Sequence, residues 1–336
     1  MRVAMLWEKT ASGRVHCFLC GHHCKIADGK RGICAVRENR GGTLYTLVYD
    51  KVISQNIDPV EKKPLFHFLP GSSSYSIATP GCNFKCAFCQ NADISQMPRD
   101  IQRILGEPVP PEEIVAGALR YGCKSISYTY TEPTIYFELA CDTARLAREA
   151  GLRNVFVSNG YITKEALTEI RPYLDAANID LKSFDEKFYQ KVCGAKLEKV
   201  LDSIRLYHEF GIWIEITTLI IPGLNDGEDE LKKIAGFLAS IDVNIPWHVT
   251  AFHPTYRLMD RPRTPAATLR RARRIGLDAG LRYVYEGNIP GEGGENTYCH
   301  SCGKTIVGRF GFSVEEYHIK AGACGFCGAH IAGVGM

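Results

Sequence analysis

The chain has 336 residues, of which 45% are apolar, and a formal net charge of +3 at pH 7. This composition can fill a substantial core, and so small a charge gives no global attraction for nucleic acid or another polyanion. The N-terminal apolar run is too short for a secretory signal, and no later run reaches the length of a membrane span. We therefore expect a cytoplasmic protein with neither membrane nor nucleic-acid partners.

Cysteine spacing is the main chemical signal. Without a secretory signal, the 14 cysteines are expected to stay reduced, and ligand-like spacings then favour metal over disulfides. Most of them form an N-terminal, a central and a C-terminal group. Cys123, Cys141 and Cys193 stand apart, and burial as small apolar side chains accounts for them.

The N-terminal group consists of Cys17, Cys20, Cys24 and Cys34, set among glycines without helical or strand periodicity. This pattern predicts a metal-binding segment over residues 1–50 that is folded around a metal rather than around an apolar core. The four thiolates could close a zinc site or hold a second iron–sulfur cluster, and a ligand could also come from His22 or His23.

A proline-punctuated connector over residues 58–68 leads into six alternations of a strand-like and a helix-like segment. Strands are expected at 74–79, 125–131, 155–157, 176–181, 213–221 and 247–252. Helices are expected at 111–121, 134–150, from 164, up to about 210, at 229–238 and at 265–280. This order predicts an α/β fold with a parallel sheet and helices outside it.

Polar residues follow the expected strands, and in a parallel sheet these carboxyl ends gather at one active-site face. In chain order they include Cys82, Cys86, Cys89, Glu132, Ser158, Asn159, Asp180, Lys182 and His253. Asp180 and Lys182 could equally form a structural ion pair, and a structural role is the plainer reading of His253 alone.

The central group, Cys82, Cys86 and Cys89, has C-x3-C-x2-C spacing on one short loop. Three thiolates can hold three irons of a 4Fe-4S cluster, and with no fourth cysteine nearby one iron stays open. An open iron next to an electron source could chelate S-adenosylmethionine and cleave it reductively. A zinc knuckle or a set of core cysteines is the alternative.

An amino-acid ligand would need an anion for its ammonium and donors for its carboxylate, which Glu132 and Ser158 could supply. An adenine would need an aromatic or apolar wall. Phe88 or Tyr130 could provide it, although core packing explains either aromatic as well.

The C-terminal group lies in two C-x2-C-G knuckles, Cys299 with Cys302 and Cys324 with Cys327. Two such turns present four sulfurs to one tetrahedral ion, so residues 293–336 are expected to form a zinc-ribbon-like segment that binds zinc or iron.

These features together resemble the radical S-adenosylmethionine superfamily, in the branch of pyruvate formate-lyase activating enzyme, and more narrowly the radical component of the AmmeMemoRadiSam system. Besides the cysteine groups, the resemblance rests on Asp58-Pro-Val-Glu-Lys-Lys-Pro-Leu, Ile221-Pro-Gly-Leu-Asn-Asp and Tyr285-Glu-Gly-Asn-Ile-Pro-Gly. It implies a partial (β/α)6 barrel over residues 51–292, a 4Fe-4S cluster on Cys82, Cys86 and Cys89, and bound S-adenosylmethionine.

The resemblance also implies residue roles and partners. Glu132 would face the ligand's ammonium and Ser158 with Asn159 its carboxylate and ribose, while Asp180, Lys182 and His253 would lie near it. Val157 stands where this branch often has a cation-binding acid, so no such cation is expected. The implied partners are a reductant such as ferredoxin or flavodoxin and Memo-like and AMMECR1-like proteins. Activation of a glycyl-radical enzyme is the alternative function.

Overall fold

The computed structural model describes residues 2–289, 291 and 293–336. Its centre is a sheet in the order β14-β13-β12-β11-β10-β9-β8-β7, in which β8 to β14 run parallel and β7 is an antiparallel edge. The strands are β7 (Ser54–Pro59), β8 (Ser73–Ala78), β9 (Ser125–Tyr128), β10 (Arg153–Ser158), β11 (Ala176–Asp180), β12 (Trp213–Ile220), β13 (Trp247–Ala251) and β14 (Val284–Gly287).

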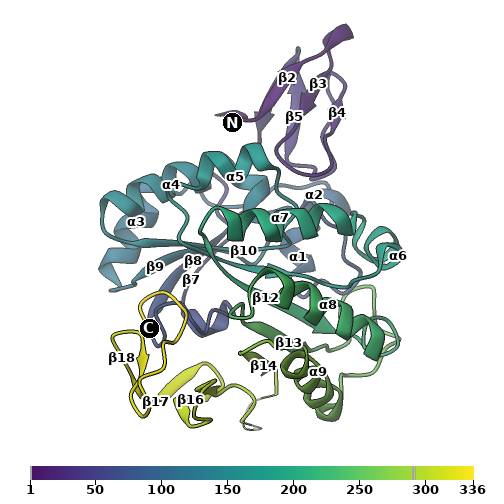
Figure 1. Cartoon of the computed structure of the whole chain (residues 1–336). Coiled ribbons are helices and arrows are strands. Elements are labelled where there is room, and N and C mark those ends of the chain that lie inside the picture. Colours follow the sequence, from purple (N-terminus) through teal and green to yellow (C-terminus); the bar gives the residue numbers. More distant parts are fainter. Residues whose placement is uncertain (1, 290, 292) are drawn as a thin grey trace.

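Helices connect the parallel strands and lie along the outside of the curved sheet (Figure 1). They are α1 (Ala92–Ser95), α2 (Met97–Asp100), α3 (Pro111–Arg120), α4 (Phe137–Glu149), α5 (Lys164–Ile170), α6 (Glu186–Phe188), α7 (Leu197–Glu209), α8 (Glu228–Ile241) and α9 (Ala266–Asp278). The order strand, helix, parallel strand confirms the predicted partial barrel. Each helical crossover brings the chain back to the end of the sheet at which the parallel strands begin.

The sheet is larger than predicted by one strand at each edge. The β7 sequence is polar, mostly exposed and ends in proline, which suits an edge strand but gives no alternating apolar pattern. At the other edge β14 has only four residues. Short or polar edge strands lack the periodicity from which the six inner strands could be predicted.

The helical region predicted up to residue 210 is interrupted. After α6 the chain forms a π-helical turn, η4 (Tyr189–Cys193), and leaves it through Gly194 at a φ of 73° before α7 begins. Another expected helix begins with a 3-10 turn, η3 (Pro133–Tyr136), before it continues as α4. Both irregular turns lie beside the active-site face, a common location for such turns.

One end of the barrel is closed by the segment that was predicted to be a connector. Glu215 of β12 is fully buried and accepts backbone N–H bonds from Phe66 at 3.0 Å and His67 at 2.7 Å. His248 of β13 contacts the same carboxylate at 2.7 Å. Because Glu215 lies near the start of its strand, this plug leaves the carboxyl ends of the strands open for a site.

The N-terminal residues form short strands, which corrects the expectation of a segment without an apolar core. Val15, Val36 and Leu44 are fully buried and continue the central core. Cys20 also bridges to Ile162, beyond β10. The strands form two sheets, β1 (Arg2–Val3), β5 (Arg37–Arg40) and β6 (Thr43–Thr46) in one and β2 (Trp7–Lys9), β3 (Val15–Cys17) and β4 (Lys25–Ile26) in the other.

The C-terminal residues form a small ribbon, which lies far from the N-terminal strands in Figure 1. Its strands are β15 (Thr297–Tyr298), β16 (Thr305–Phe310), β17 (Ser313–Tyr317), β18 (Ile319–Lys320) and β19 (Ala323–Cys324). Buried Ile306 and Val307 pack with Phe66 of the barrel plug. Buried Arg309 donates to the carbonyl oxygen of Phe66 at 2.8 Å, so the ribbon is fastened to the closed end of the barrel.

None of the helices formed by the described residues is long and apolar enough to cross a membrane.

His67 should make stability depend on acidity. Burial lowers the pKa of this imidazole to about 4, against about 6.5 for an exposed histidine. Its Nδ1 lies 2.7 Å from the carbonyl oxygen of Ala332, and its Nε2 lies 2.6 Å from the hydroxyl of Tyr285. The neutral ring can satisfy both contacts by donating from Nδ1 and accepting at Nε2.

Between about pH 6.5 and pH 4, the His67 side chain is protonated in the unfolded chain but stays neutral in the folded chain. The stability is therefore complete above about pH 6.5 and should fall by up to about 3 kcal/mol as the pH drops towards 4. Urea unfolding between pH 7 and pH 4.5 would measure this loss. His67→Gln can still donate to Ala332 but does not titrate, so its acid loss should be smaller, and equal losses in both proteins would contradict the assignment.

Candidate active site and metal centres

A cavity of about 520 Å³ opens at the carboxyl ends of the parallel strands. The predicted site residues that line it are Cys82, Cys86, Phe88, Cys89, Glu132, Ser158, Asn159, Asp180 and Lys182. A volume of this size suits a small-molecule cofactor or substrate. His253 follows β13 but is exposed and lies outside the cavity lining.

The loop that carries the central cysteines leaves β8 through a close backbone contact. Gly81 has a φ of 107°, and a Cβ at this position would lie 2.7 Å from Val36. The loop therefore rests on the N-terminal strands, and only glycine fits at that contact. The backbone N–H of Phe84 then points to the Cys82 sulfur at 3.4 Å.

Each central cysteine has a polar neighbour that could support a metal-bound sulfur. The Asn159 side-chain amide lies 3.7 Å from the Cys82 sulfur, and the Ser95 hydroxyl lies 3.2 Å from the Cys89 sulfur. The Cys86 thiol contacts the thiol of Cys193 at the end of η4. Cys193 is therefore not isolated from the site, contrary to the expectation from its sequence position.

The free thiols are in their neutral form. Burial raises the pKa of Cys82 well above its usual value, and it also raises the pKa of Cys89. For Cys86 the hydrogen bond with Cys193 and then burial raise the pKa. Binding of a metal or cluster to these sulfurs would therefore displace protons from them.

Glu132 joins two of the strand ends. Its side chain is 1% exposed, and its Oε1 accepts bonds from the Thr134 backbone N–H at 3.0 Å, the Thr134 hydroxyl at 2.6 Å and the Ser158 hydroxyl at 2.8 Å. Oε2 accepts the Asn159 backbone N–H at 2.8 Å. Burial raises the pKa of Glu132, and these donors counteract that rise.

The network continues from Glu132 to the cysteine loop. The Asn159 side chain donates to Asn83 Oδ1 at 2.7 Å, next to Cys82. The amide nitrogen of Asn83 is buried without a hydrogen-bond partner among the described residues. An unused buried donor is costly, so a sulfur or carboxylate acceptor would fit beside it. This donor and the three thiols make the residues present suitable for a cluster with an amino-acid ligand.

Lys182 and Asp180 form an ion pair at the end of β11, with their charged atoms 2.8 Å apart. Burial acts to lower the pKa of Lys182, but the charge and hydrogen bond of Asp180 raise it well above its usual value. The ammonium also lies 5.7 Å from the centre of the Phe88 ring. A positive charge is thus held on the cysteine side of the cavity.

Segments outside the six inner strands complete the cavity, although they were not predicted to be part of it. Lys62 and Lys63 come from the turn after β7, and Phe312 comes from the ribbon. Lys63 is buried and pairs with Asp58, which also accepts from the Tyr130 hydroxyl. The Asp58-Pro-Val-Glu-Lys-Lys motif was the available signal, whereas an aromatic residue in the tail gave none.

The C-terminal cysteines are packed for a single ion. The sulfurs of Cys299 and Cys327 lie 3.6 Å apart, and those of Cys302 and Cys324 lie 3.8 Å apart. All four sulfurs lie within 4.8 Å of one another. A tetrahedral ion with bonds of about 2.3 Å requires sulfur separations of about 3.8 Å. The residues present therefore fit zinc or iron bound by four thiolates.

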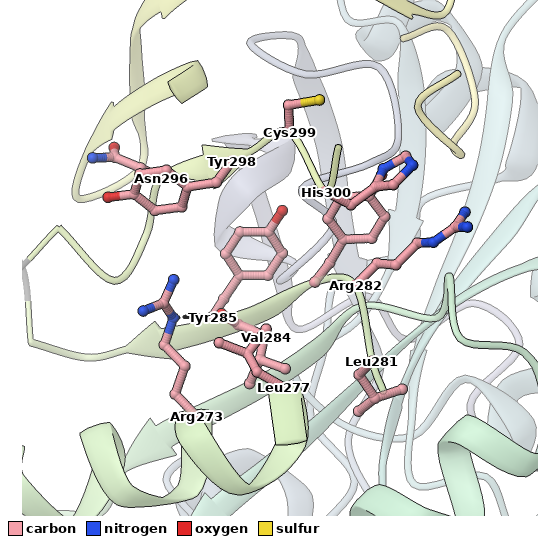
Figure 2. A pocket seen from close by; sticks show the side chains of 11 residues that line it. Arg273, Leu277, Leu281, Arg282, Val284, Tyr285, Asn296, Tyr298, Cys299 and His300 are labelled. Carbon is pink, nitrogen blue, oxygen red and sulfur yellow. Dashed lines mark hydrogen bonds between the residues drawn. The ribbon is translucent and has the colours of Figure 1, made fainter. Parts of the chain in front are cut away.

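A second cavity, of about 330 Å³, lies between α9, β14 and the ribbon. Figure 2 shows Arg273 and Leu277 on the helix side and Tyr298, Cys299 and His300 on the ribbon side. Tyr283 and His300 are in contact there, with the phenol oxygen 3.1 Å from Nδ1. The lining of this second cavity contains none of the strand-end carboxylates or central thiols. We therefore interpret the cavity as a gap at the junction of barrel and ribbon.

Comparisons with known proteins agree with this geometry. Residues 76–238 match the family model described as the radical SAM superfamily. The chain is 47% identical over 334 residues to an uncharacterised protein of Methanocaldococcus jannaschii, with 98% of this chain and 99% of the relative covered. It is 30% identical over 185 residues to a candidate glycyl-radical enzyme activating enzyme of the same organism, covering 54% of this chain and 68% of that protein.

The fold has solved counterparts. The structure of Streptococcus suis SuiB bound to S-adenosylmethionine superimposes with a TM-score of 0.51 at 16% identity, and the match covers 68% of this chain and 53% of SuiB. The chain belongs to the radical S-adenosylmethionine superfamily, whose members use a 4Fe-4S cluster and S-adenosylmethionine. Its relatives include proteins that resemble the activating enzyme of pyruvate formate-lyase.

Removal of one ribbon cysteine should release one metal ion. We expect Cys302→Ser to lose one equivalent of zinc or iron per chain, because a closed tetrahedral site needs all four sulfurs. The ribbon should then become sensitive to proteolysis, since it has few apolar residues of its own. Anaerobic metal quantification with limited proteolysis would measure both effects. Cys123→Ser, outside the three groups, is the matched control, and unchanged metal in Cys302→Ser would contradict the site.

Proposed function

We propose that the chain is a radical S-adenosylmethionine enzyme whose cluster is held by Cys82, Cys86 and Cys89. The observation that carries this proposal is the cavity at the strand ends, which brings the three thiols together with Glu132 and Ser158. When bound, the cluster and S-adenosylmethionine supply a one-electron reductive cleavage that gives methionine and a 5'-deoxyadenosyl radical for hydrogen abstraction from a substrate.

The residues around the thiols would bind and orient the amino-acid end of S-adenosylmethionine. Glu132 Oε2 accepts one backbone N–H and has capacity for an ammonium. The buried amide nitrogen of Asn83 offers an unused donor to a carboxylate. Phe88, which is 4% exposed, provides an apolar wall that keeps water from the reacting atoms.

The mouth of the cavity would receive the substrate. The residues that line the cavity from outside the six inner strands, Lys62 and Lys63 after β7, Asn288 after β14 and Phe312 in the ribbon, are the candidates for contact with the substrate. Lys63 is neutralised by Asp58, whereas Lys62 is half-exposed and also pairs with Asp58. This part of the lining therefore combines a half-exposed ammonium, an amide and an aromatic ring, which suits a polar substrate with an apolar part.

Within this class, the motifs of the chain support a role in the AmmeMemoRadiSam system. The substrate would be a small molecule or protein modified together with Memo-like and AMMECR1-like partners, and a ferredoxin or flavodoxin would supply the electron. The alternative is activation of a glycyl-radical enzyme. It is favoured by the 30% identical relative, which is named for that activity.

The central cysteines should be required for cleavage of S-adenosylmethionine. We expect the triple variant Cys82→Ala, Cys86→Ala, Cys89→Ala to form no 5'-deoxyadenosine above background after anaerobic reconstitution and reduction, because three thiolates are needed to hold the cluster. Chromatographic quantification of 5'-deoxyadenosine would measure this. Cys123→Ala should retain activity, and wild-type turnover by the triple variant would overturn the proposed site.

The two candidate roles differ in where the radical goes. If the chain works with Memo-like and AMMECR1-like proteins, adding them with extract should raise the yield of 5'-deoxyadenosine, with no stable protein radical. A glycyl-radical activating enzyme would instead give a long-lived electron paramagnetic resonance doublet on a purified glycyl-radical protein. Observation of that doublet would overturn the AmmeMemoRadiSam role and support activation of a glycyl-radical enzyme.

A further inference from the structure

The four N-terminal cysteines line one small cavity, although they come from separate turns and strands. Cys17 ends β3, Cys20 and Cys24 flank the following turn, and Cys34 lies before β5. All four line a pocket that also contains Arg37 and Ile135. The cysteines therefore converge on a shared space at the contact of the N-terminal strands with the barrel.

The backbone around this cavity is shaped to leave room near the sulfurs. A Cβ at Gly32 would lie 3.2 Å from Ile26 and 3.6 Å from the Cys24 sulfur. The neighbouring N–H of Ile33 points to the same sulfur at 3.5 Å. Backbone donors close to cysteine sulfurs are a feature that iron–sulfur sites use to set the cluster's properties.

A buried cation borders the cavity. Arg37 is 1% exposed, and its Nη1 lies 3.5 Å from the Cys17 sulfur. The guanidinium also contacts the buried carboxylate of Glu138. The Nε of Arg37 has no hydrogen-bond partner among the described residues. Because a buried donor without an acceptor is costly, the cavity is built for an electron-rich occupant beside this group.

The N-terminal cysteines differ from the C-terminal group in how closely their sulfurs are gathered. Among the described residues, the C-terminal cysteines form a set with all sulfurs within 4.8 Å, whereas the N-terminal four do not. The central cysteines, in the segment that matches the radical SAM family, are not drawn together in this way either. In a 4Fe-4S cluster each sulfur binds a different iron, so its sulfurs stand farther apart than those around one zinc ion.

We propose that Cys17, Cys20, Cys24 and Cys34 hold a second 4Fe-4S cluster, with Arg37 as a charge-compensating neighbour. Four thiolates complete its coordination, so this cluster has no open iron and does not bind S-adenosylmethionine. Four thiolates suffice for this cluster, so no histidine ligand is required, although His22 also lines the cavity. The Nε2 of His22 lies 2.9 Å from the carbonyl oxygen of Asn83, and His23 packs its ring on His16 with centroids 5.6 Å apart.

The second site is joined directly to the loop of the central cysteines. Arg99 bonds the carbonyl oxygen of Ile33 at 2.8 Å, next to Cys34, and it also contacts the carbonyl oxygen of Cys82. His22 makes a parallel link from the turn between Cys20 and Cys24 to Asn83. Two clusters held at these sites should be close enough for their unpaired electrons to interact, and this expectation rests on the proposed function of the central site.

The test compares anaerobically reconstituted wild-type chain, the triple alanine variant of the central cysteines and the double variant Cys20→Ala, Cys24→Ala. The triple variant should retain about four iron and four sulfide, with a reduced-state resonance of a 4Fe-4S cluster. The double variant should lose about four iron and keep its ribbon metal. Cys123→Ala is the control with an unaltered content.

A triple variant with extra zinc and without a cluster signal would overturn the proposal, whether or not the wild-type chain cleaves S-adenosylmethionine. Because the triple variant keeps all four N-terminal cysteines, it tests the proposal even if the double variant fails to fold. In reduced wild-type protein, we expect the resonance to be broadened or split relative to the sum of the two variants. A wild-type spectrum equal to the sum of the two variant spectra would contradict the link between the sites. If only the proposed function is wrong, the triple variant should still show the N-terminal cluster.

Discussion

The buried carboxylate of Glu132 is the constraint on which the geometry of the active-site face depends. Its two oxygens accept bonds from Thr134, Ser158 and Asn159, so that the loops after β9 and β10 are fixed to each other. The side chain of Asn159 then extends the connection to Asn83 in the cysteine loop. A carboxylate is taken out of water at considerable cost unless it accepts hydrogen bonds, and here it accepts four. Three strand ends thereby become one rigid surface.

The three cysteine groups show how metal and apolar packing share the stabilisation of this chain. The ribbon has a small core and sulfurs already gathered for one ion, so its metal would act mainly as a staple. The N-terminal strands instead place fully buried side chains in the central core. Apolar packing therefore stabilises the N-terminal strands, and a metal centre there would not be the sole source of their stability. This packing would also hold the metal ligands in fixed positions.

The inner strands and the polar residues at their ends could be predicted from the sequence, because both follow from simple patterns along the chain. Buried parallel strands are apolar throughout, and their carboxyl ends meet at one face. The edge strand β7 was missed since its residues are polar, and β14 because it is short. The contact of Cys193 with Cys86 depends on the π-helical turn η4, which no local pattern indicated. Sulfur spacing, which distinguishes the cysteine groups, is a property of tertiary structure alone.

One wall of the cavity belongs to a different unit from the rest. Phe312 follows β16 at the tip of a hairpin, and it lines the same space as the cysteine loop although it comes from the C-terminal ribbon. The cysteine loop and this part of the cavity wall are thus encoded by segments far apart in the sequence, which meet because the ribbon packs on the barrel. Replacement of a single hairpin could change which molecules are accepted while every cluster ligand stays in place, so the ribbon offers evolution a modular route to new substrates.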